Sequence, residues 1–307
     1  MHAASGEYVM KVLVTGAAGF IGKHLVRELV RKGYAVVAFD KNQEIMETKF
    51  VHGDIVSFDF DELLEDVDVV FHLAGLLGTT ELFHRIIEAE KVNVLGTLNL
   101  LESMRRNDVD KIVFTSKPNL WKYNVYTVTK ENCERYLEMY REIYGFKTVI
   151  TRPFNVYGPG ESLRKYRKAI PYFIVAALRN EPLEIFGNGK QTMDTIYVDD
   201  VVKALIGCAE KLPKETVEMG TSKPIKVIDL AKKIIKLTGS RSQICYKPMR
   251  KGETNPTYIC ANDSMKRFLG LKPRTRLEVG LKRTINFYRK NLDEFKEIYK
   301  FKEWDFC

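Results

Sequence analysis

The 307-residue sequence has only five cysteines, and their arrangement suggests neither a disulfide framework nor a metal site. There is no CxxC motif and no other paired spacing, so we expect reduced thiols and no bound metal. No apolar run is long enough to cross a bilayer, and the opening segment does not resemble a signal peptide. These absences predict a cytoplasmic protein. The cysteines are Cys133, Cys208, Cys245, Cys260 and Cys307.

The chain also lacks the features of a nucleic-acid-binding module, although it is basic. Its formal net charge is +9, from 49 Lys and Arg against 40 Asp and Glu. The basic residues are spread widely, with some concentration over 223–289, and no stripe of aromatic and basic residues accompanies them. We therefore expect no nucleic acid and no membrane as partner. The charge is explained either by solvated helix faces or by steering of an anionic nucleotide substrate.

Short apolar runs alternate with helical periodicity through the N-terminal half of the chain. Strands are expected at 11–15, 35–40, 67–72, 111–115 and 147–151, and helices at 22–31, 92–104 and 130–144. This alternation predicts parallel βαβ units with helices on both faces, a Rossmann doubly wound α/β fold. Beyond Pro153 the chain is richer in glycine and proline and then mixed and basic, which predicts a smaller C-terminal mixed α/β part. We predict an NAD-binding Rossmann domain of residues 10–160 and 194–212, and a substrate-binding domain of residues 161–193 and 213–307.

A glycine-rich segment, GAAGFIG at 16–22, follows the first expected strand and opens a helix. Gly16 permits a tight turn, Gly19 lets the backbone approach a pyrophosphate, and Gly22 lets helix and strand pack closely. The helix N-terminus then presents free N–H groups to the phosphates. The segment predicts a dinucleotide-binding site.

Asp40 ends the second expected strand, where a carboxylate can accept hydrogen bonds from the hydroxyls of the adenosine ribose. A 2′-phosphate would be repelled by that carboxylate, so the residue favours NAD. The neighbouring Lys41 leaves NADP open.

Tyr126 and Lys130 form a YxxxK motif at the start of a helix, and their spacing places both side chains on one face. A free phenol has a pKa of about 10 and is a poor base at neutral pH. A nearby ammonium group and a nicotinamide ring would favour the phenolate and make it a usable general base. On these two residues alone, an ordinary amphipathic helix with a surface lysine remains an alternative.

Further motifs occur in a set order: GDI at 53–55, HLAG at 72–75, VNVLGT at 92–97, RPFNVYG at 152–158 and IYVDD at 196–200. With them the chain resembles the extended short-chain dehydrogenase/reductases, specifically the NAD-dependent epimerase/dehydratase family that acts on nucleotide sugars. The resemblance runs from Met10 to about Tyr288.

The resemblance implies an NAD cofactor, a nucleotide-diphosphate sugar such as a UDP-sugar as substrate, and Tyr126 and Lys130 as the acid/base pair. It implies that Asn155 reaches the substrate phosphates and Arg250 pairs with the diphosphate; a loop cap and a solvated arginine are the alternatives. The implied cofactor-binding residues are Gly16, Gly19, Phe20, Ile21, Gly22, Asp40, Lys41, Asp54, Ile55, Leu73, Ala74, Gly75, Asn93, Thr115, Tyr126, Lys130 and Pro153.

The resemblance also implies a homodimer, in which the helices at 92–104 and 130–144 form a four-helix bundle with those of the partner. The apolar positions Val94, Leu98 and Leu101 suit such a bundle, but they suit packing on the sheet equally well.

The sequence departs from the family pattern near the expected acid/base pair. Lys117 stands in the position of a serine or threonine that contacts the substrate oxygen, and Ser116 could replace it only if the strand end shifts. Lys117 either donates a hydrogen bond to the reacting oxygen, and so acts in catalysis, or points to solvent and leaves the site impaired. The segment between Trp121 and Tyr126 is also short, which predicts a site that is either more open or completed by another segment.

Two other positions bear on the substrate and the reaction. Met193 replaces a common diphosphate-binding arginine, and Lys190 is the candidate to compensate for it. Pro118 and Asn119 replace the Asp-Glu pair of the dehydratases, so neither dehydration nor decarboxylation is supported. Three functions remain: an epimerase that oxidises a sugar hydroxyl transiently, a keto-sugar reductase that consumes NAD(P)H, and a non-catalytic NAD-binding regulator.

Overall fold

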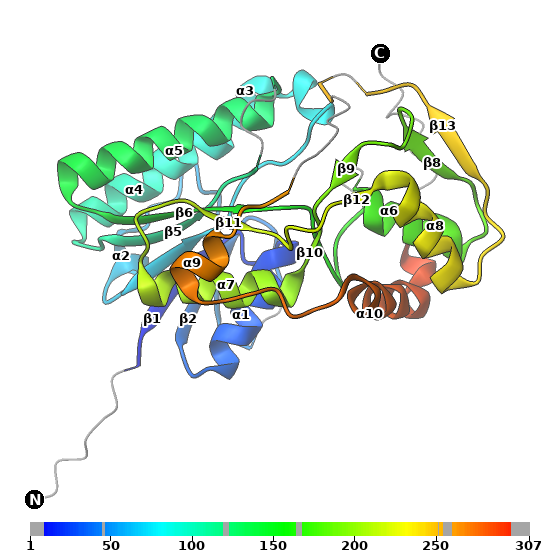
Figure 1. Cartoon of the computed structure of the whole chain (residues 1–307). Coiled ribbons are helices and arrows are strands. Elements are labelled where there is room, and N and C mark those ends of the chain that lie inside the picture. Colours follow the sequence, from blue (N-terminus) through cyan, green and yellow to red (C-terminus); the bar gives the residue numbers. More distant parts are fainter. Residues whose placement is uncertain are drawn as a thin grey trace, which may run out of the picture.

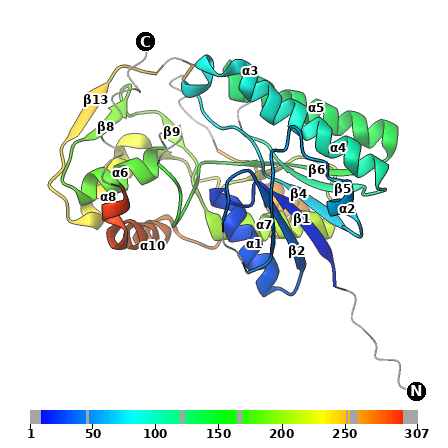
Figure 2. The ribbon, with the colours of Figure 1, turned by 180° about the vertical axis from the view of Figure 1, so that it is seen from behind.

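A seven-stranded, all-parallel sheet forms the centre of the computed structural model, which describes residues 9–44, 47–118, 123–163, 168–250, 252–253 and 260–295. The strand order is β11-β6-β5-β4-β1-β2-β3 (Figures 1 and 2). Chain order reverses between β1 and β4, as in a Rossmann sheet, so the doubly wound α/β prediction is confirmed. The strands are β1 (Lys11–Thr15), β2 (Ala35–Asp40), β3 (Lys49–His52), β4 (Val69–His72), β5 (Lys111–Thr115), β6 (Lys147–Pro153) and β11 (Val217–Met219).

Helices cover both faces of the sheet (Figure 1). Val12 and Val14 of β1 belong to the core on the side of α1 and α7, whereas Leu13 belongs to the core on the side of α4 and α5. This division follows from the alternation of side chains along a strand that is buried on both faces. The helices are α1 (Phe20–Arg31), α2 (Asp61–Leu64), α4 (Gly96–Arg106), α5 (Val125–Tyr144) and α7 (Val198–Lys211).

Short helical turns connect β4 to α4. They are η1 (Glu81–His84), α3 (Ile86–Ala89) and the π-helical turn η2 (Glu90–Leu95), and they run along the same side of the sheet as α5 (Figure 1).

A smaller group of elements lies beside the sheet, beyond the carboxyl ends of its strands (Figure 1). Three helices pack on one another there, and β8 pairs in parallel with β13. Two further pairs of short strands, β7 with β10 and β9 with β12, connect this group to the sheet. Its elements are α6 (Ala169–Leu178), α8 (Val227–Thr238), α10 (Leu277–Lys290), β7 (Val156–Tyr157), β8 (Leu183–Phe186), β9 (Thr192–Met193), β10 (Ile196–Tyr197), β12 (Ile225–Lys226) and β13 (Ile244–Lys247).

One stretch of the predicted substrate-binding part belongs to the sheet instead. β11 lies within the predicted range 213–307, yet it pairs with β6 as the last strand of the central sheet. Helix α9 (Ser264–Leu269) packs against β11 and α7, so it also sits on the Rossmann side. The chain therefore crosses between the two parts more often than the composition indicated. The rest of the division stays a prediction.

Within the described residues, no helix has the length and apolar character needed to pass through a membrane. The same residues contain no cluster of three or more His, Cys, Asp or Glu side chains placed to hold a metal ion.

Candidate active site

A cavity of about 960 Å³ lies at the carboxyl ends of the central strands, between the sheet and the smaller group of elements. Ligands bind at this switch point in open α/β sheets. Every site residue predicted from the sequence lines the cavity except Asn93. The structure therefore brings together the segments that follow β1 and β4 and residues of β2, β5 and α5 with Asn155 and Arg250 from the later part of the chain.

The turn after β1 requires glycine at two of its positions. Gly16 has a φ of +73°, and a Cβ there would come within 2.6 Å of the backbone of Ala74. At Gly22 a Cβ would lie 2.2 Å from the carbonyl oxygen of Gly16. Helix α1 begins directly after Gly19 without a side-chain cap or an acidic residue in its first turn. Its first N–H groups are thus open to an anionic ligand.

Asp40 has a fixed carboxylate at the end of β2. Its Oδ2 accepts a hydrogen bond of 3.1 Å from Ala18 N, within the glycine turn. Its Oδ1 accepts from the backbone and side-chain nitrogens of Asn42, at 2.8 Å and 3.0 Å. The acid at the end of the second strand is therefore tied to the phosphate turn, as a ribose-binding carboxylate requires.

Tyr126 and Lys130 lie on the first turns of α5. The helix starts at Val125, five residues before the predicted position, because the side chain of Asn124 caps it by accepting from Thr127 N at 3.0 Å. Lys130 is 2% exposed and donates a 2.9 Å hydrogen bond from Nζ to the carbonyl oxygen of Thr115. Burial lowers the pKa of Lys130. Lys130 is therefore not the surface lysine of the alternative interpretation.

Lys117 contacts the same turn of α5. Its Nζ donates to Oγ1 of Thr127 at 2.8 Å, and Thr127 donates in turn to Asn124 Oδ1 at 3.1 Å. The side chain lines the cavity and is half-buried, so it does not simply extend into solvent. Ser116 N still bonds to Thr151 O at 2.8 Å. The strand end is thus not shifted in the way that would bring Ser116 into the position of Lys117.

The cavity lining includes two side-chain hydroxyl groups, those of Thr115 and Ser116. Thr115 Oγ1 and Ser116 Oγ are buried, and neither has a hydrogen-bond partner among the described residues. Buried polar atoms are normally satisfied, so orphaned hydroxyls in a cavity wall fit a polar ligand. They lie beside the carbonyl that binds Lys130, where a dinucleotide held at the glycine turn would extend.

Asn93 corrects the predicted cofactor-binding set. It is 1% exposed and does not line the cavity. Its Oδ1 accepts from Leu76 N at 2.6 Å, and its Nδ2 donates to Leu76 O at 3.1 Å and to Thr129 Oγ1 at 2.9 Å. From the π-helical turn η2, Asn93 holds the loop after β4 against α5 and so supports the cavity wall from behind.

His72 is a buried residue to which the sequence analysis assigned no role. Its Nδ1 lies 2.7 Å from Thr15 Oγ1 and its Nε2 lies 2.9 Å from Thr97 Oγ1. Because the Thr97 hydroxyl donates to Asn93 O at 2.5 Å, it accepts from His72, whose Nε2 then carries the proton. Burial, with a smaller effect of the charge of Lys130, lowers the pKa of His72 to about 3. The HLAG motif was the signal that could have located it.

The residues predicted for the substrate phosphates face the cavity from the other side. Arg250 is not solvated: its Nη2 donates to Glu253, its Nη1 lies 3.8 Å from Glu81 Oε1, and its side chain is 20% exposed. Asn155 has a φ of +27° and donates from Nδ2 to Asp194 O at 2.7 Å, so it does cap a loop while it lines the cavity.

The remaining positions at which the sequence departs from the family pattern are placed differently by the structure. Met193 lines the cavity, whereas Lys190 is exposed and is not part of the lining. The expectation that Lys190 compensates for the missing arginine is therefore wrong. Pro118 also lines the cavity. Asn119, Trp121 and Lys122 lie outside the described residues, whereas Tyr123, Asn124 and Val125 are described.

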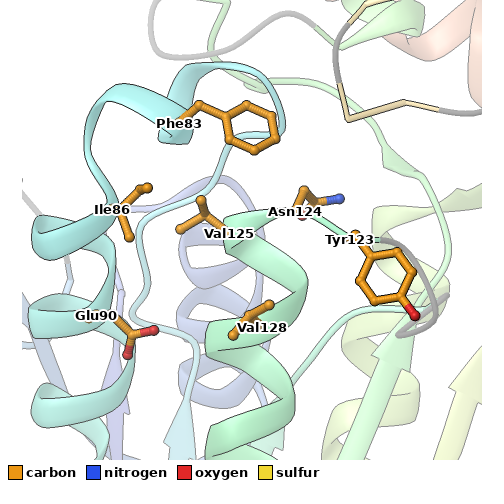
Figure 3. A pocket seen from close by; sticks show the side chains of 7 residues that line it. All are labelled: Phe83, Ile86, Glu90, Tyr123, Asn124, Val125 and Val128. Atoms are coloured by element: carbon orange, nitrogen blue, oxygen red, sulfur yellow. The ribbon is translucent and has the colours of Figure 1, made fainter.

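A second, smaller pocket of about 230 Å³ opens next to the first. Figure 3 shows Val125 and Val128 on α5 facing Ile86 and Phe83 on the neighbouring helical turns. Asn124 lines both hollows. The lining is largely apolar, and Ile86 and Val128 are each 47% exposed.

Comparison with known proteins agrees with this geometry. A model of the NAD dependent epimerase/dehydratase family matches residues 12–220. The chain is 35% identical over 304 residues to a putative UDP-glucose 4-epimerase of Methanocaldococcus jannaschii, an alignment that covers 91% of this chain and 99% of that protein.

Two solved structures are similar over most of the chain. A UDP-glucose 4-epimerase of Thermotoga maritima, solved with UDP-glucose, has a TM-score of 0.84 and 31% identity, with 92% of this chain and 100% of that chain covered. A UDP-glucuronic acid 4-epimerase of Bacillus cereus, solved with UDP-glucuronic acid and NAD, has a TM-score of 0.85 and 27% identity, with the same coverage.

Proposed function

The chain belongs to the NAD-dependent epimerase/dehydratase family, and on that premise we propose that it is an NAD-dependent nucleotide-sugar epimerase. The observation that carries the proposal is the arrangement of Tyr126 and Lys130 in one cavity with the glycine turn of β1. That arrangement supports the proposal, because a general base at Tyr126 would share one cavity with a dinucleotide and with the residues that would hold a substrate phosphate.

The residues present fit an NAD molecule. The first N–H groups of α1 would bind its pyrophosphate, Asp40 the hydroxyls of its adenosine ribose, and the unpartnered hydroxyls of Thr115 and Ser116 its nicotinamide half. Asp54 and Ile55 line the cavity near the end of β2 and would contact the adenine. A bound NAD would supply the hydride acceptor for oxidation of a sugar carbon and the hydride donor for reduction of the resulting ketone from its opposite face.

Tyr126 is the acid/base residue of this proposal. Its phenolate would take the proton of the sugar hydroxyl as the carbon is oxidised, and return it after the ketone is reduced. Lys130 supports that role from within the same helix, because its buried ammonium is held in place by Thr115 O. An electropositive environment favours the phenolate form of Tyr126.

We propose that Lys117 takes the part of the missing serine or threonine. Its ammonium group is anchored next to Tyr126 by Thr127 and lines the cavity. From there it can donate to the reacting oxygen of the sugar and add positive charge beside the phenol. Arg250 and Asn155 would hold the diphosphate of the substrate, and the similarity to UDP-glucose and UDP-glucuronic acid epimerases favours a UDP-sugar.

We also propose a homodimer. Its interface is formed by different residues from those that the sequence analysis predicted. Val94 and Leu101 are buried in the core on the α4 and α5 side of the sheet, and the half-buried Leu98 packs against that core. A separate set of large apolar side chains is 42–70% exposed on the turns after β4 and on α5. These elements run along the same side of the sheet (Figure 1). An apolar surface of this kind is typical of an interface. Its members are Ile86, Ile87, Leu95, Val128, Met139, Ile143 and Tyr144.

The cell compartment is likewise a proposal. Cys133, Cys208, Cys245 and Cys260 are free thiols, and unpaired cysteines are typical of the reducing cytoplasm. We therefore propose a cytoplasmic location.

Incubation of the purified protein with UDP-, GDP- and dTDP-sugars, with and without added NAD, tests the proposed reaction. An epimerase gives a new stereoisomer, resolved by chromatography and NMR, without net change in reduced-cofactor absorbance. Net consumption of NADH or NADPH would instead identify a keto-sugar reductase. NAD binding without any product would favour the non-catalytic regulator.

The variant Tyr126→Phe separates catalysis from binding. We expect a loss of turnover of about 100-fold or more with unchanged NAD affinity. Tyr123→Phe is the matched control, because Tyr123 is 94% exposed and lies just before α5. Equal activity of Tyr126→Phe and wild type would contradict the assignment of the general base.

A further inference from the structure

Arg250 is held between two carboxylates on the cavity wall. Its Nη2 donates to Glu253, and its Nη1 lies 3.8 Å from Oε1 of Glu81. Glu81 comes from η1, on the loop after β4, whereas Arg250 belongs to the later part of the chain. The side chain of Glu81 is only 9% exposed. The ion pair thus joins the two walls of the cavity.

The backbone around Arg250 is packed on the same turn as Glu81. Gly252 has a φ of +75°, and a Cβ there would come within 2.8 Å of the ring of Phe83. The guanidinium carbon of Arg250 lies 5.0 Å from the centre of the Phe186 ring. Packing against aromatic rings, as well as charge, therefore holds Arg250 beside Glu81.

Glu81 and Arg250 do not use all of their hydrogen-bonding capacity on each other. Glu81 Oε2 accepts from Thr79 N at 2.8 Å, but the 3.8 Å separation between Oε1 and Arg250 is too long for a hydrogen bond. Arg250 Nε is buried without a hydrogen-bond partner among the described residues. Arg250 can therefore still offer N–H donors to an anion while Glu81 stays beside it.

The charge at this wall opposes an anionic ligand. One guanidinium faces two carboxylates, and Met193, which lines the same cavity, adds no positive charge. We propose that Glu81 competes with the substrate diphosphate for Arg250 and so weakens nucleotide binding, which eases release of the product. This inference rests on the proposed function, because it assumes that a diphosphate reaches Arg250.

The variant Glu81→Gln tests the competition directly. Its amide oxygen can still accept from Thr79 N, but the negative charge is gone. We expect UDP to bind on the order of tenfold more tightly in calorimetry at low salt. The gain should shrink as salt is added, since screening weakens charge interactions. KM for the nucleotide sugar should fall in parallel without a rise in kcat.

Two further variants complete the design. Glu62→Gln makes the same change of charge at an exposed position on α2, outside the cavity, and should leave UDP affinity unchanged. Glu81→Ala removes the charge together with the bond to Thr79 N, and should also tighten UDP binding. A residue with a purely structural role would give weaker binding in both Glu81 variants.

The two proposals fail in different ways. If the wild type binds UDP and neither Glu81 variant binds it more tightly, the competition is contradicted while the proposed function stands. If the wild type binds none of UDP, dTDP and GDP, the nucleotide-sugar function itself is contradicted, and the role of Glu81 with it.

Discussion

Lys117 Nζ donates a 2.8 Å hydrogen bond to Oγ1 of Thr127, the residue that follows Tyr126. Thr127 is itself bonded to Asn124, which caps α5. From the next turn of the helix, Lys130 donates to Thr115 O. Two ammonium groups therefore connect the start of α5 to the end of β5, and both lie close in the chain to the proposed general base.

Lys117→Ala tests whether this lysine replaces the usual hydroxyl. We expect kcat to fall about 100-fold, because a donor to the reacting oxygen is lost. The rise of activity with pH should also move to higher pH, since the phenolate of Tyr126 loses a neighbouring positive charge. Initial rates measured across pH check both effects.

Lys111→Ala is the matched control for Lys117, because Lys111 begins β5, the strand that precedes Lys117, and does not line the cavity. Wild-type turnover in Lys117→Ala would refute the catalytic role. A lower rate with an unchanged pH profile would assign Lys117 to positioning of α5 alone.

Gly22→Ala should abolish NAD binding and destabilise the protein. A Cβ at residue 22 would lie 2.2 Å from Gly16 O, so the phosphate turn and α1 must move apart. We expect a loss of about 3 kcal/mol in the free energy of unfolding. Gly33→Ala is the control: its φ is +86°, but no atom lies within 4 Å of the added carbon.

Thermal unfolding and NAD calorimetry measure both glycine variants. Gly33→Ala should cost about 1 kcal/mol through its backbone conformation and leave NAD affinity intact. Comparable NAD affinity in Gly22→Ala and wild type would mean that the turn is not the pyrophosphate site.

The part of the site with a local pattern was predictable from the sequence. The glycine turn and the Tyr126–Lys130 pair each lie within one short segment, so spacing alone places their residues together. Contacts such as Lys117 with Thr127 and Glu81 with Arg250 join separate segments, and no local pattern encodes them. The role of Asn93 was missed for the same reason, because its partners Leu76 and Thr129 lie on other elements.

The fold shows a similar division. The buried strands β1, β2, β4, β5 and β6 were predicted because they are continuous apolar runs. β3 was missed, since it has four residues, none of them fully buried, at the edge of the sheet. β11 was placed in the wrong part because three residues give no period, and only pairing with β6 defines them as a strand.

Acid should destabilise the protein through His72. Its pKa is lowered from 6.5 to about 3 in the fold by burial, so between these values the unfolded chain binds the extra proton. The contribution of His72 to the free energy of unfolding is therefore fully present above its unfolded pKa of 6.5, and it is lost as the pH falls below that value. Between pH 7 and pH 5 we expect a loss of about 2 kcal/mol from this residue.

Urea unfolding of wild type and His72→Gln across that pH range measures the effect. The variant lacks the titrating ring, so the gap in stability between it and wild type should narrow by about 2 kcal/mol on acidification. His52→Gln, at an exposed position on β3, is the matched control for loss of a histidine. A constant gap between wild type and His72→Gln would show that His72 does not titrate differently on unfolding.

A charge on the exposed apolar face should prevent the proposed dimer. Ile143, near the end of α5, is 68% exposed, so Ile143→Glu adds a charge there without disturbing the core. If that face is an interface, the carboxylate must be desolvated on association, and the dimer should dissociate to monomers at micromolar concentration.

Val279→Glu, at a 42% exposed position on α10, is the control and should leave the assembly unchanged. Sedimentation velocity of the three proteins measures the masses. A monomeric wild type, or a dimer that survives Ile143→Glu, would rule out this face as the interface.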